Sequence, residues 1–506
     1  MTRRVLPGLL LATAMWGQTT PPEAVPLTDR ALQLPLSGRS STPGTVVTVQ
    51  NPLPSGLQSV NTITSTVQVQ GAYQGSVPSV TTSGPSFPLS LGEALRRGLQ
   101  YNLGNIGYQN GIREAQGVSK VVRSELLPNV SSNLLVTEEQ ISLAALGFTG
   151  FPGFNLPAVV GPFHYFDLRA GVAQSVFDLT RLRNYRGAKE EVRSTQFSAQ
   201  DARDLIVLAV TGGYLQVVTA ITRVATVQAQ VATAQATYQQ AVDRHTAGVA
   251  PLIDVTRTEV ELKTQQQRLT SVQNDLAKLK IALGRLIGLP PGQEFTLSDT
   301  LPFAPLTSIT LEQALTNAYL HRADLKAAES QVRAAEMTRK AAVAERYPTV
   351  SLAADYGVIG ASPASSHGTF AVTGAVRMPI FTGGRIAGDI EQADAALSQR
   401  RSEYLDLRGR IDADVRTAFL DLTSAASQVG VAESNRGLAQ QTLTQARDRF
   451  AAGVADTLEV VQAQETVAAA EQDYISALYA HNVAKATLAR ALGQADQNIK
   501  QFLSIP

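Results

Sequence analysis

The chain has 506 residues, enough for two or three ordinary domains or for one large elongated one. Its 43 basic and 42 acidic residues leave a formal net charge of +1, so it lacks the excess positive charge that typifies nucleic-acid-binding proteins. It contains no cysteine, which excludes thiol catalysis, cysteine-ligated metals, disulfides and a lipidated cysteine after the signal sequence.

The first residues have the pattern of a secretory signal peptide. Arg3 and Arg4 form a charged start, residues 5–11 are largely apolar, and residues 12–14 (ATA) offer a cleavage site. We therefore predict a signal peptide at residues 1–17; a weak amphipathic start on a cytosolic protein is the alternative. No later segment has about 18 uninterrupted apolar residues, so any membrane-spanning part is predicted to be a β-barrel.

From residue 89 onward the sequence repeats itself. Four motifs of the first copy return in the second copy, the first two after 220 positions and the last two after 204 and 205 positions. The first copy therefore holds about sixteen extra residues between its second and third motifs. Because the pairs occur in the same order, they indicate a tandem duplication. The pairs are LGEAL (91–95) with LEQAL (311–315), LPNVS (127–131) with YPTVS (347–351), FDLTR (177–181) with FTGGR (381–385), and RHTAGVA (244–250) with RFAAGVA (449–455).

The duplication divides the chain into segments. Each copy is predicted to run helix, strand pair, very long helix, tight turn and long helix. The segment before the first copy is rich in Ser, Thr, Pro, Gly, Val and Gln with few charges, a composition typical of a flexible leader. The predicted segments are a leader at 18–88, a first repeat at 89–288, a linker at 289–308, a second repeat at 309–493 and a C-terminal tail at 494–506.

The strand regions alternate with a period of two. Apolar residues such as Phe166, Leu168 and Val372 alternate with small or polar ones such as Asp167 and Arg169. One apolar and one polar face is typical of a membrane strand beside a wet lumen, although a strand of an ordinary sandwich looks the same. The extra residues of the first copy fall in its strand hairpin, where aromatic residues indicate either a membrane interface or a mobile surface loop. These aromatic residues are Phe148, Phe151, Phe154, Phe163, Tyr165 and Phe166.

The long helices are predicted from the absence of proline. Residues 179–245 and 385–450 contain none, so each could form a helix about 100 Å long. The returning helices carry apolar residues every seven positions, a pattern that packs helices side by side in a coiled coil. Since two hairpins cannot close a tube alone, we expect an oligomer. The heptad positions are Val255, Leu262, Leu269, Leu276 and Leu283, and then Val460, Val467, Tyr474, His481 and Leu488, with Ala463, Ala470, Ala477, Ala484 and Ala491 between them.

Residues 89–493 resemble the TolC-like outer-membrane efflux protein (outer membrane factor) family. The resemblance rests on the Leu-x-x-Ala-Leu helix starts, the Leu-Pro-x-Val and Tyr-Pro-x-Val strand entries, FTGGR at 381–385 and the Arg-x-x-Ala-Gly-Val turns. In the first copy, FDLTR at 177–181 departs from this pattern and keeps only the aromatic residue and the arginine.

The resemblance implies a mixed α/β membrane protein that forms a homotrimer. Four strands per subunit would make a 12-stranded β-barrel in outer membrane lipid, continued by a 12-helix periplasmic α-barrel. The partners it implies are a periplasmic adaptor (membrane fusion) protein and an inner-membrane pump. The implied function is a passive exit duct of a tripartite efflux or type I secretion system.

The two turns between the long helices are the main candidate site. Gly248 and Gly453 suit the left-handed conformation that ends a helix, and the next helices are predicted to begin after Pro251 and at Asp456, a possible N-cap. The resemblance makes these turns the periplasmic tip where the adaptor docks; a helical hairpin turn without a partner is the alternative. The predicted contact residues are Arg244, Gly248, Val249, Arg449, Gly453 and Val454.

Two carboxyl groups, Asp254 and Glu459, stand six residues beyond the turn glycines. The resemblance places them at a periplasmic constriction, where rings of carboxylates attract cations. First-turn acids that stabilise a helix N-terminus are an equally good explanation. Some relatives have an arginine that locks the closed state where this chain has Ala455, so a salt-bridge lock of that kind is not expected.

No motif in the sequence indicates catalysis. The five histidines show no ligand spacing, and there is no nucleophile elbow, P-loop or dinucleotide-binding motif. We therefore predict no enzymatic activity, no cofactor and no metal. Two rivals to the duct are a trimeric coiled-coil adhesin or stalk, which explains the heptads but not the duplicated strand hairpins, and a soluble periplasmic binding module.

Overall fold

The computed structural model describes residues 46–51, 64–69, 71–78, 84–147, 157–299, 303–305 and 309–504. The chain forms two compact units, which are described separately: a strand unit with Ser124–Arg181 and Ala344–Phe381, and a helical unit with most of the remaining residues. The predicted signal peptide and the tip of the first strand hairpin, which includes Phe148, Phe151 and Phe154, lie outside the described residues.

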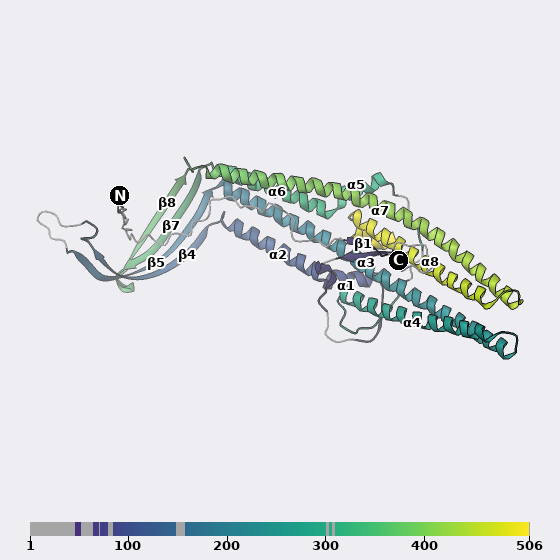
Figure 1. Cartoon of the computed structure of the whole chain (residues 1–506). Helices are drawn as coiled ribbons and strands as arrows, with labels where there is room; N and C mark the ends of the chain where they lie inside the picture. Colours follow the sequence, from purple (N-terminus) through teal and green to yellow (C-terminus); the bar gives the residue numbers. More distant parts are fainter. Residues whose placement is uncertain are drawn as a thin grey trace, which may run out of the picture. The chain divides into compact units, whose positions relative to one another are not determined.

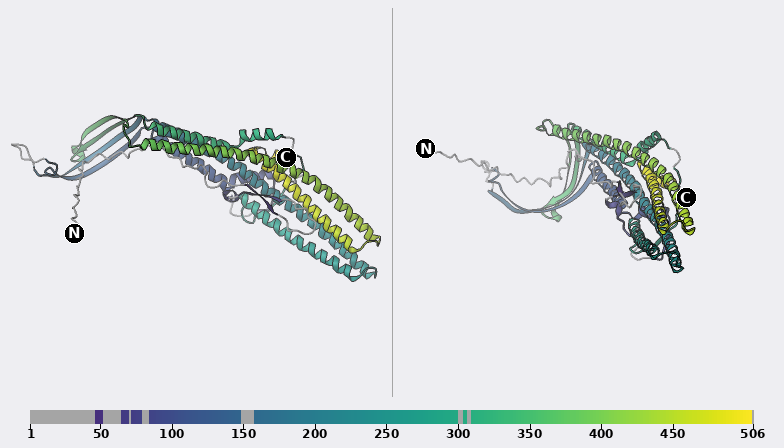
Figure 2. Two further views of the ribbon diagram at one scale, coloured as in Figure 1. Left: turned by 45° about the horizontal axis from the view of Figure 1, so that its top comes forward. Right: turned by 45° about the vertical axis from the view of Figure 1, so that its right-hand side comes forward.

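The strand unit contains one four-stranded antiparallel sheet with the order β4-β5-β7-β8. Each copy of the repeat supplies one hairpin, and the two hairpins join through β5 and β7. Figure 2 shows the sheet as curved. The strands are β4 (Asn129–Ser142), β5 (Val159–Phe177), β7 (Thr349–Gly360) and β8 (His367–Arg377), with a short 3-10 helix η2 (Pro363–Ser365) between the last two.

The register separates the two faces of this sheet. Residues directly opposite each other share a face, and Leu168 lies opposite Val358, while Arg169 lies opposite Gly357. The face that carries Leu168 is apolar and solvent-exposed along its length; the other is mostly small and polar. The predicted period of two is thus confirmed. The exposed apolar residues include Val130, Leu134, Val136, Leu168, Val172, Leu352, Tyr356, Phe370, Val372 and Val376.

The helical unit repeats one order of elements. The first copy runs α1, α2, the strand hairpin, α3 and α4, and the second runs α5, α6, the strand hairpin, α7 and α8. The proline-free segments are the long helices α3 and α7, and Figure 1 shows α4 beside α3 and α8 beside α7. The helices are α1 (Leu91–Tyr101), α2 (Leu103–Ser124), α3 (Leu179–Thr246), α4 (Leu252–Leu286), α5 (Leu311–His321), α6 (Ala323–Ala344), α7 (Arg385–Ala451), α8 (Thr457–Ala491) and α9 (Ala495–Leu503).

The heptad seam of α8 is buried. Val460, His481 and Leu488 are buried, as are the five alanines between the heptad positions, whereas Val467 and Tyr474 are half-buried. In α4, Leu262 and Leu283 are buried, whereas Leu276 lies at the edge of the core. α8 packs against α7 along this seam, as the heptad pattern predicted. Among the described helices, only α3 contains an 18-residue stretch apolar enough to cross a membrane, and 61% of that stretch is buried within the chain.

The largest core lies where both copies of the repeat meet. Tyr214 of α3 is fully buried, and its one O–H group is shared between two acceptors, the Leu89 carbonyl (3.2 Å) and Asp299 (3.1 Å). Asp299 also accepts a hydrogen bond from the Leu91 backbone N–H at 2.7 Å, so it caps the start of α1. The core therefore joins segments that are more than one hundred residues apart in the sequence.

The structure differs from the predicted flexible leader at residues 18–88. Its described part contains β1 (Val46–Asn51) paired antiparallel with β2 (Thr64–Val69), and a short 3-10 helix η1 (Gly71–Gln74). The strand sequences VVTVQN and TSTVQV are rich in Val and Thr, whose β-branched side chains favour strands. The described strands of this segment therefore pair with each other, where the sequence predicted a flexible leader.

The linker and the tail are also ordered in part. β3 (Phe87–Leu89) pairs in parallel with β6 (Phe295–Leu297), which lies within the linker predicted at 289–308. The tail predicted at 494–506 contains α9, whose apolar residues Ile499, Phe502 and Leu503 are buried. These short elements close the core at the junction of the two copies.

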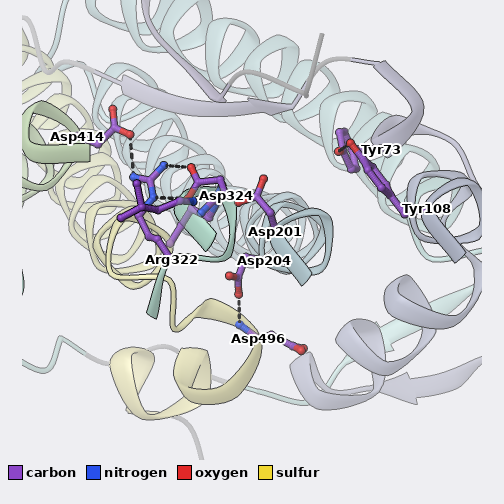
Figure 3. A network of polar contacts seen from close by, with 10 residues as sticks. Tyr73, Tyr108, Asp201, Asp204, Arg322, Asp324, Asp414 and Asp496 are labelled. Carbon is purple, nitrogen blue, oxygen red and sulfur yellow. Dashed lines mark hydrogen bonds and ion pairs between the residues drawn. The ribbon is translucent and has the colours of Figure 1, made fainter. Parts of the chain in front are cut away.

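A network of charged residues, most of them buried or half-buried, lies beside this core (Figure 3). Arg322 donates hydrogen bonds to Asp324 at 2.6 Å and to Asp414 at 2.9 Å, and the Asp496 backbone N–H donates to Asp204 at 2.8 Å. Burial raises the pKa of Asp201 to about 6, although the charge of neighbouring Arg490 acts in the opposite direction. Burial also raises the pKa of Asp204.

Candidate functional site

The two turns at the ends of the helical hairpins have the same hydrogen-bond pattern. The backbone N–H of Val249 donates to the Arg244 carbonyl at 3.0 Å, and that of Val454 donates to the Arg449 carbonyl, also at 3.0 Å. The preceding glycines have left-handed backbones, with φ of 76° at Gly248 and 74° at Gly453. This is the Schellman arrangement. The predicted left-handed conformation is therefore confirmed at both turns.

The helices that follow the turns begin where the sequence predicted, but only one of them has a side-chain N-cap. α4 begins after Pro251, which has no side-chain cap. α8 begins after Asp456, whose side chain accepts a hydrogen bond from the Glu459 backbone N–H at 3.1 Å. The predicted N-cap is thus confirmed, and only the second turn has one.

Each turn presents apolar side chains to solvent. Val249 and Val454 are 66% and 68% exposed, and their neighbours Leu252, Ile253 and Leu458 are exposed as well. An added Cβ at Gly248 or Gly453 would meet no other atom within 4 Å. A concentration of exposed apolar residues is typical of a surface that binds another protein.

The two equivalent arginines of the turns make different contacts. The Arg244 guanidinium lies over the Phe450 ring and donates a hydrogen bond to the Phe450 carbonyl at 3.2 Å, so it joins the first hairpin to the second. Arg449 instead pairs with Glu459 of its own hairpin at 3.4 Å. The contact of Arg244 with Phe450 was not predicted from the sequence. The repeat aligns Phe450 with His245, so the residue at this position differs between the two copies.

The predicted constriction carboxyls are both ion-paired within the chain. Asp254 lies 3.6 Å from Arg257 one turn later, and Glu459 pairs with Arg449. Both stand in the first turn of a helix, where a carboxylate is stabilised by the helix dipole. Their convergence with the carboxyls of other copies in a constriction stays a prediction.

The sequence matches a known protein family in both copies of the repeat. A family model described as outer membrane efflux protein matches residues 111–289 and 314–494, one range in each copy of the repeat. The pyoverdine export outer membrane protein OpmQ of Pseudomonas aeruginosa is 24% identical over 406 residues, which cover 78% of this chain and 82% of OpmQ.

Solved structures show the same fold. The outer membrane protein VceC from Vibrio cholerae matches with a TM-score of 0.68 and 20% identity, over 80% of this chain and 96% of VceC. The CmeC outer membrane channel of Campylobacter jejuni matches with a TM-score of 0.70 and 14% identity, over 91% of this chain and 98% of CmeC.

Proposed function

The chain belongs to the outer membrane efflux protein family, and from this premise we propose that it is the channel subunit of a tripartite export assembly. It acts as a passive duct across the periplasm and the outer membrane. Cargo enters from a periplasmic adaptor and an inner-membrane pump, which supplies the energy. Family membership favours this duct over a trimeric adhesin or stalk without transport activity.

The two-faced sheet is the observation that carries the proposal. One face is apolar along four strands, and the other carries Asp167, Arg169 and Asp355; neither face packs on a core within the described residues. In a water-soluble sheet an apolar face would pack on a core, but here it is exposed. If lipid covers the apolar face and water covers the other, the side chains of each face contact a solvent that matches their polarity.

The free edges of the sheet support a trimer. Among the described strands, β4 pairs only with β5, and β8 pairs only with β7, so one edge of each is open. Open edges within a bilayer must be paired, because lipid offers no hydrogen bonds. Three copies joined edge to edge would make a 12-stranded barrel. Each copy contributes four long helices, so the three copies together would make a 12-helix tube.

The apolar turns support an adaptor contact. We propose that Val249, Val454 and their glycine turns receive the adaptor, and that Asp254 and Glu459 line the narrow end of the tube. The exposure of the two valines and the equal backbone geometry of the two turns agree with a partner that meets both hairpins. The side-chain contacts differ between the turns, so such a partner meets two kinds of site.

Conductance in planar lipid bilayers tests the duct, with a matched pair of variants on β8. Val372 lies on the apolar face and Thr373 beside it on the polar face. An arginine at a lipid-facing position costs about 2–4 kcal/mol near the bilayer midplane. We therefore expect Val372→Arg to lose channels, whereas Thr373→Arg keeps them. A folded wild-type protein that never conducts would overturn the proposal and favour the stalk.

A further inference from the structure

Residues 303–305, which lie within the linker between the two copies of the repeat, rest on α8. The rings of Phe303 and His481 have their centres 4.9 Å apart, with planes tilted by 49°. The Lys485 ammonium donates a hydrogen bond to the Ala304 carbonyl. His481 and Lys485 are four residues apart and therefore lie on the same face of α8. Two successive linker residues are thus fastened to two neighbouring side chains of one helix.

The two α8 side chains are buried although both can carry a positive charge. His481 is 1% exposed and Lys485 is fully buried, whereas Phe303 beside them is 40% exposed. The linker segment therefore lies at the surface, and the two bases lie beneath it. Burial of a charged group is costly unless an opposite charge compensates it, because the group loses its hydration.

No carboxylate compensates the two bases within the described part of the chain. The Nδ1 atom of His481 is buried without a hydrogen-bond partner there, and burial alone lowers the pKa of Lys485. Burial, and after it the charge of Lys485, lower the pKa of His481 to about 4. The His481 ring is therefore neutral near neutral pH while the linker is attached.

The charged groups on the elements packed around this part of α8 are engaged elsewhere. The Arg223 guanidinium of α3 donates to the Ser476 hydroxyl at 3.2 Å. Burial alone raises the pKa of Asp421 on α7, and Asp496 of α9 forms an ion pair with α3. Residues 303–305 contain no charged residue, and neither does β2, which also contacts α8. A proton gained by His481 would therefore face only the positive charge of Lys485.

We propose that residues 303–305 form an acid-released strap, which covers His481 and Lys485 near neutral pH and leaves α8 when His481 gains a proton. Two positive charges one helical turn apart repel each other, and burial weakens the screening by water. Departure of the strap lets water reach both groups. The linker thus acts as a pH-dependent restraint on the second helical hairpin.

Proton binding favours the released strap. The pKa of His481 is about 4 with the strap attached, whereas the ordinary value of histidine is 6.5. Attachment is therefore weakened as pH falls from about 6.5 to about 4. The ratio of released to attached strap is expected to rise roughly fiftyfold between pH 7 and pH 4.5. This regulation goes beyond the duct, because it concerns the linker and not the path of the cargo.

Tryptophan fluorescence of the detergent-solubilised full-length protein tests the strap. The single tryptophan of the chain is Trp16, so Trp16→Phe with Phe303→Trp leaves one indole, on the strap. We expect its Stern–Volmer constant for acrylamide quenching to rise at least twofold from pH 7 to pH 4.5. Adding His481→Phe keeps an aromatic ring that cannot be protonated and should abolish this rise. The matched control His321→Phe removes an exposed histidine of α5 and should keep it.

A second variant separates the strap from general stability. Lys485→Met removes the donor to the Ala304 carbonyl, so we expect stronger quenching already at pH 7. Its melting temperature should not fall, because an uncompensated buried ammonium is removed as well. Unchanged quenching in Lys485→Met at pH 7 would refute the strap.

Three other outcomes would overturn the proposal. The first is quenching that does not change with pH. The second is an equal rise with and without His481→Phe, which would assign the response to other groups. The third is a loss of the helical signal in circular dichroism that parallels the quenching, which would show general unfolding in acid. None of these measurements depends on channel activity.

Discussion

The guanidinium carbon of Arg244 lies 4.4 Å from the centre of the Phe450 ring, and the same side chain donates a hydrogen bond to the Phe450 carbonyl. The two residues belong to different hairpins of one chain, and Phe450 is itself buried against Val460 and Ala463. This contact therefore fastens the turn of the first hairpin to the packed end of the second.

Removal of this contact should loosen the tip. A cation–π contact and a charge-assisted hydrogen bond are together worth about 1 kcal/mol or more at a half-exposed site. In Arg244→Gln we expect the open fraction of single channels to rise about fivefold or more. Arg449→Gln is the matched control, because its ion pair lies within one hairpin. An equal rise in both variants would contradict a special role for Arg244.

The turn glycines should be needed for adaptor docking. Valine at Gly248 and Gly453 would have to adopt a left-handed backbone, which costs about 1–2 kcal/mol for each turn, and would add bulk beside the exposed valines. We expect efflux to fall while trimers persist in native gels. Gly437→Val adds the same side chain to α7 at a position where an added Cβ also meets nothing within 4 Å. Efflux at the wild-type level in the turn variants would remove the docking assignment.

Arg169 should set the charge preference of the duct. On the polar face of the sheet it contacts Asp355, Asp167 at 3.4 Å and Thr369 at 3.3 Å, so one arginine balances two carboxylates. Arg169→Gln leaves both carboxylates uncompensated, and we expect the permeability of K⁺ relative to Cl⁻ to rise. The reversal potential in a KCl gradient measures this ratio. The double swap Arg169→Asp with Asp355→Arg keeps the net charge and should keep the wild-type ratio.

The buried carboxyl of Asp201 should make stability depend on pH. Because burial raises its pKa from 3.8 to about 6, protonation favours the folded state. The contribution of Asp201 to the free energy of unfolding therefore rises as pH falls from about 6 to about 4, by up to roughly 3 kcal/mol. We expect the melting temperature of the wild-type protein minus that of Asp201→Asn to be larger at pH 4.5 than at pH 7. A difference that does not change with pH would refute this.

The comparison with Asp201→Asn is necessary because His481 acts in the opposite direction. Burial and the charge of Lys485 lower the pKa of His481 to about 4, so the folded state disfavours its protonation. Its contribution to stability is lost as pH falls from about 6.5 to about 4. Both titrations occur in the same pH range, and only the difference between variants isolates Asp201.

Local patterns in the sequence predicted much of the fold. The repeat gave the order of the elements, the absence of proline gave α3 and α7, and the alternation along β5 and β8 gave the two faces of the sheet. The left-handed glycines and the Asp456 cap were also predictable, because each depends only on neighbouring residues. Such features can be predicted without knowledge of the contacts between distant parts of the chain.

The unpredicted features are contacts between distant residues. The pairing of β3 with β6 joins Phe87 to Phe295, and neither three-residue strand has a recognisable pattern. The contact of Arg244 with Phe450 depends on how two hairpins pack, which the heptads of α4 and α8 do not specify.

The equal lengths of the returning helices limit how this protein can evolve. α4 and α8 each have 35 residues, which is five heptads, and they pair with helices of 68 and 67 residues. A single inserted residue would turn every later seam position by about 100° and bury polar side chains. Viable insertions or deletions are therefore expected in units of seven and in all four helices together. A change in the width of the periplasm would thus require coordinated genetic changes in both halves of the duplicated gene.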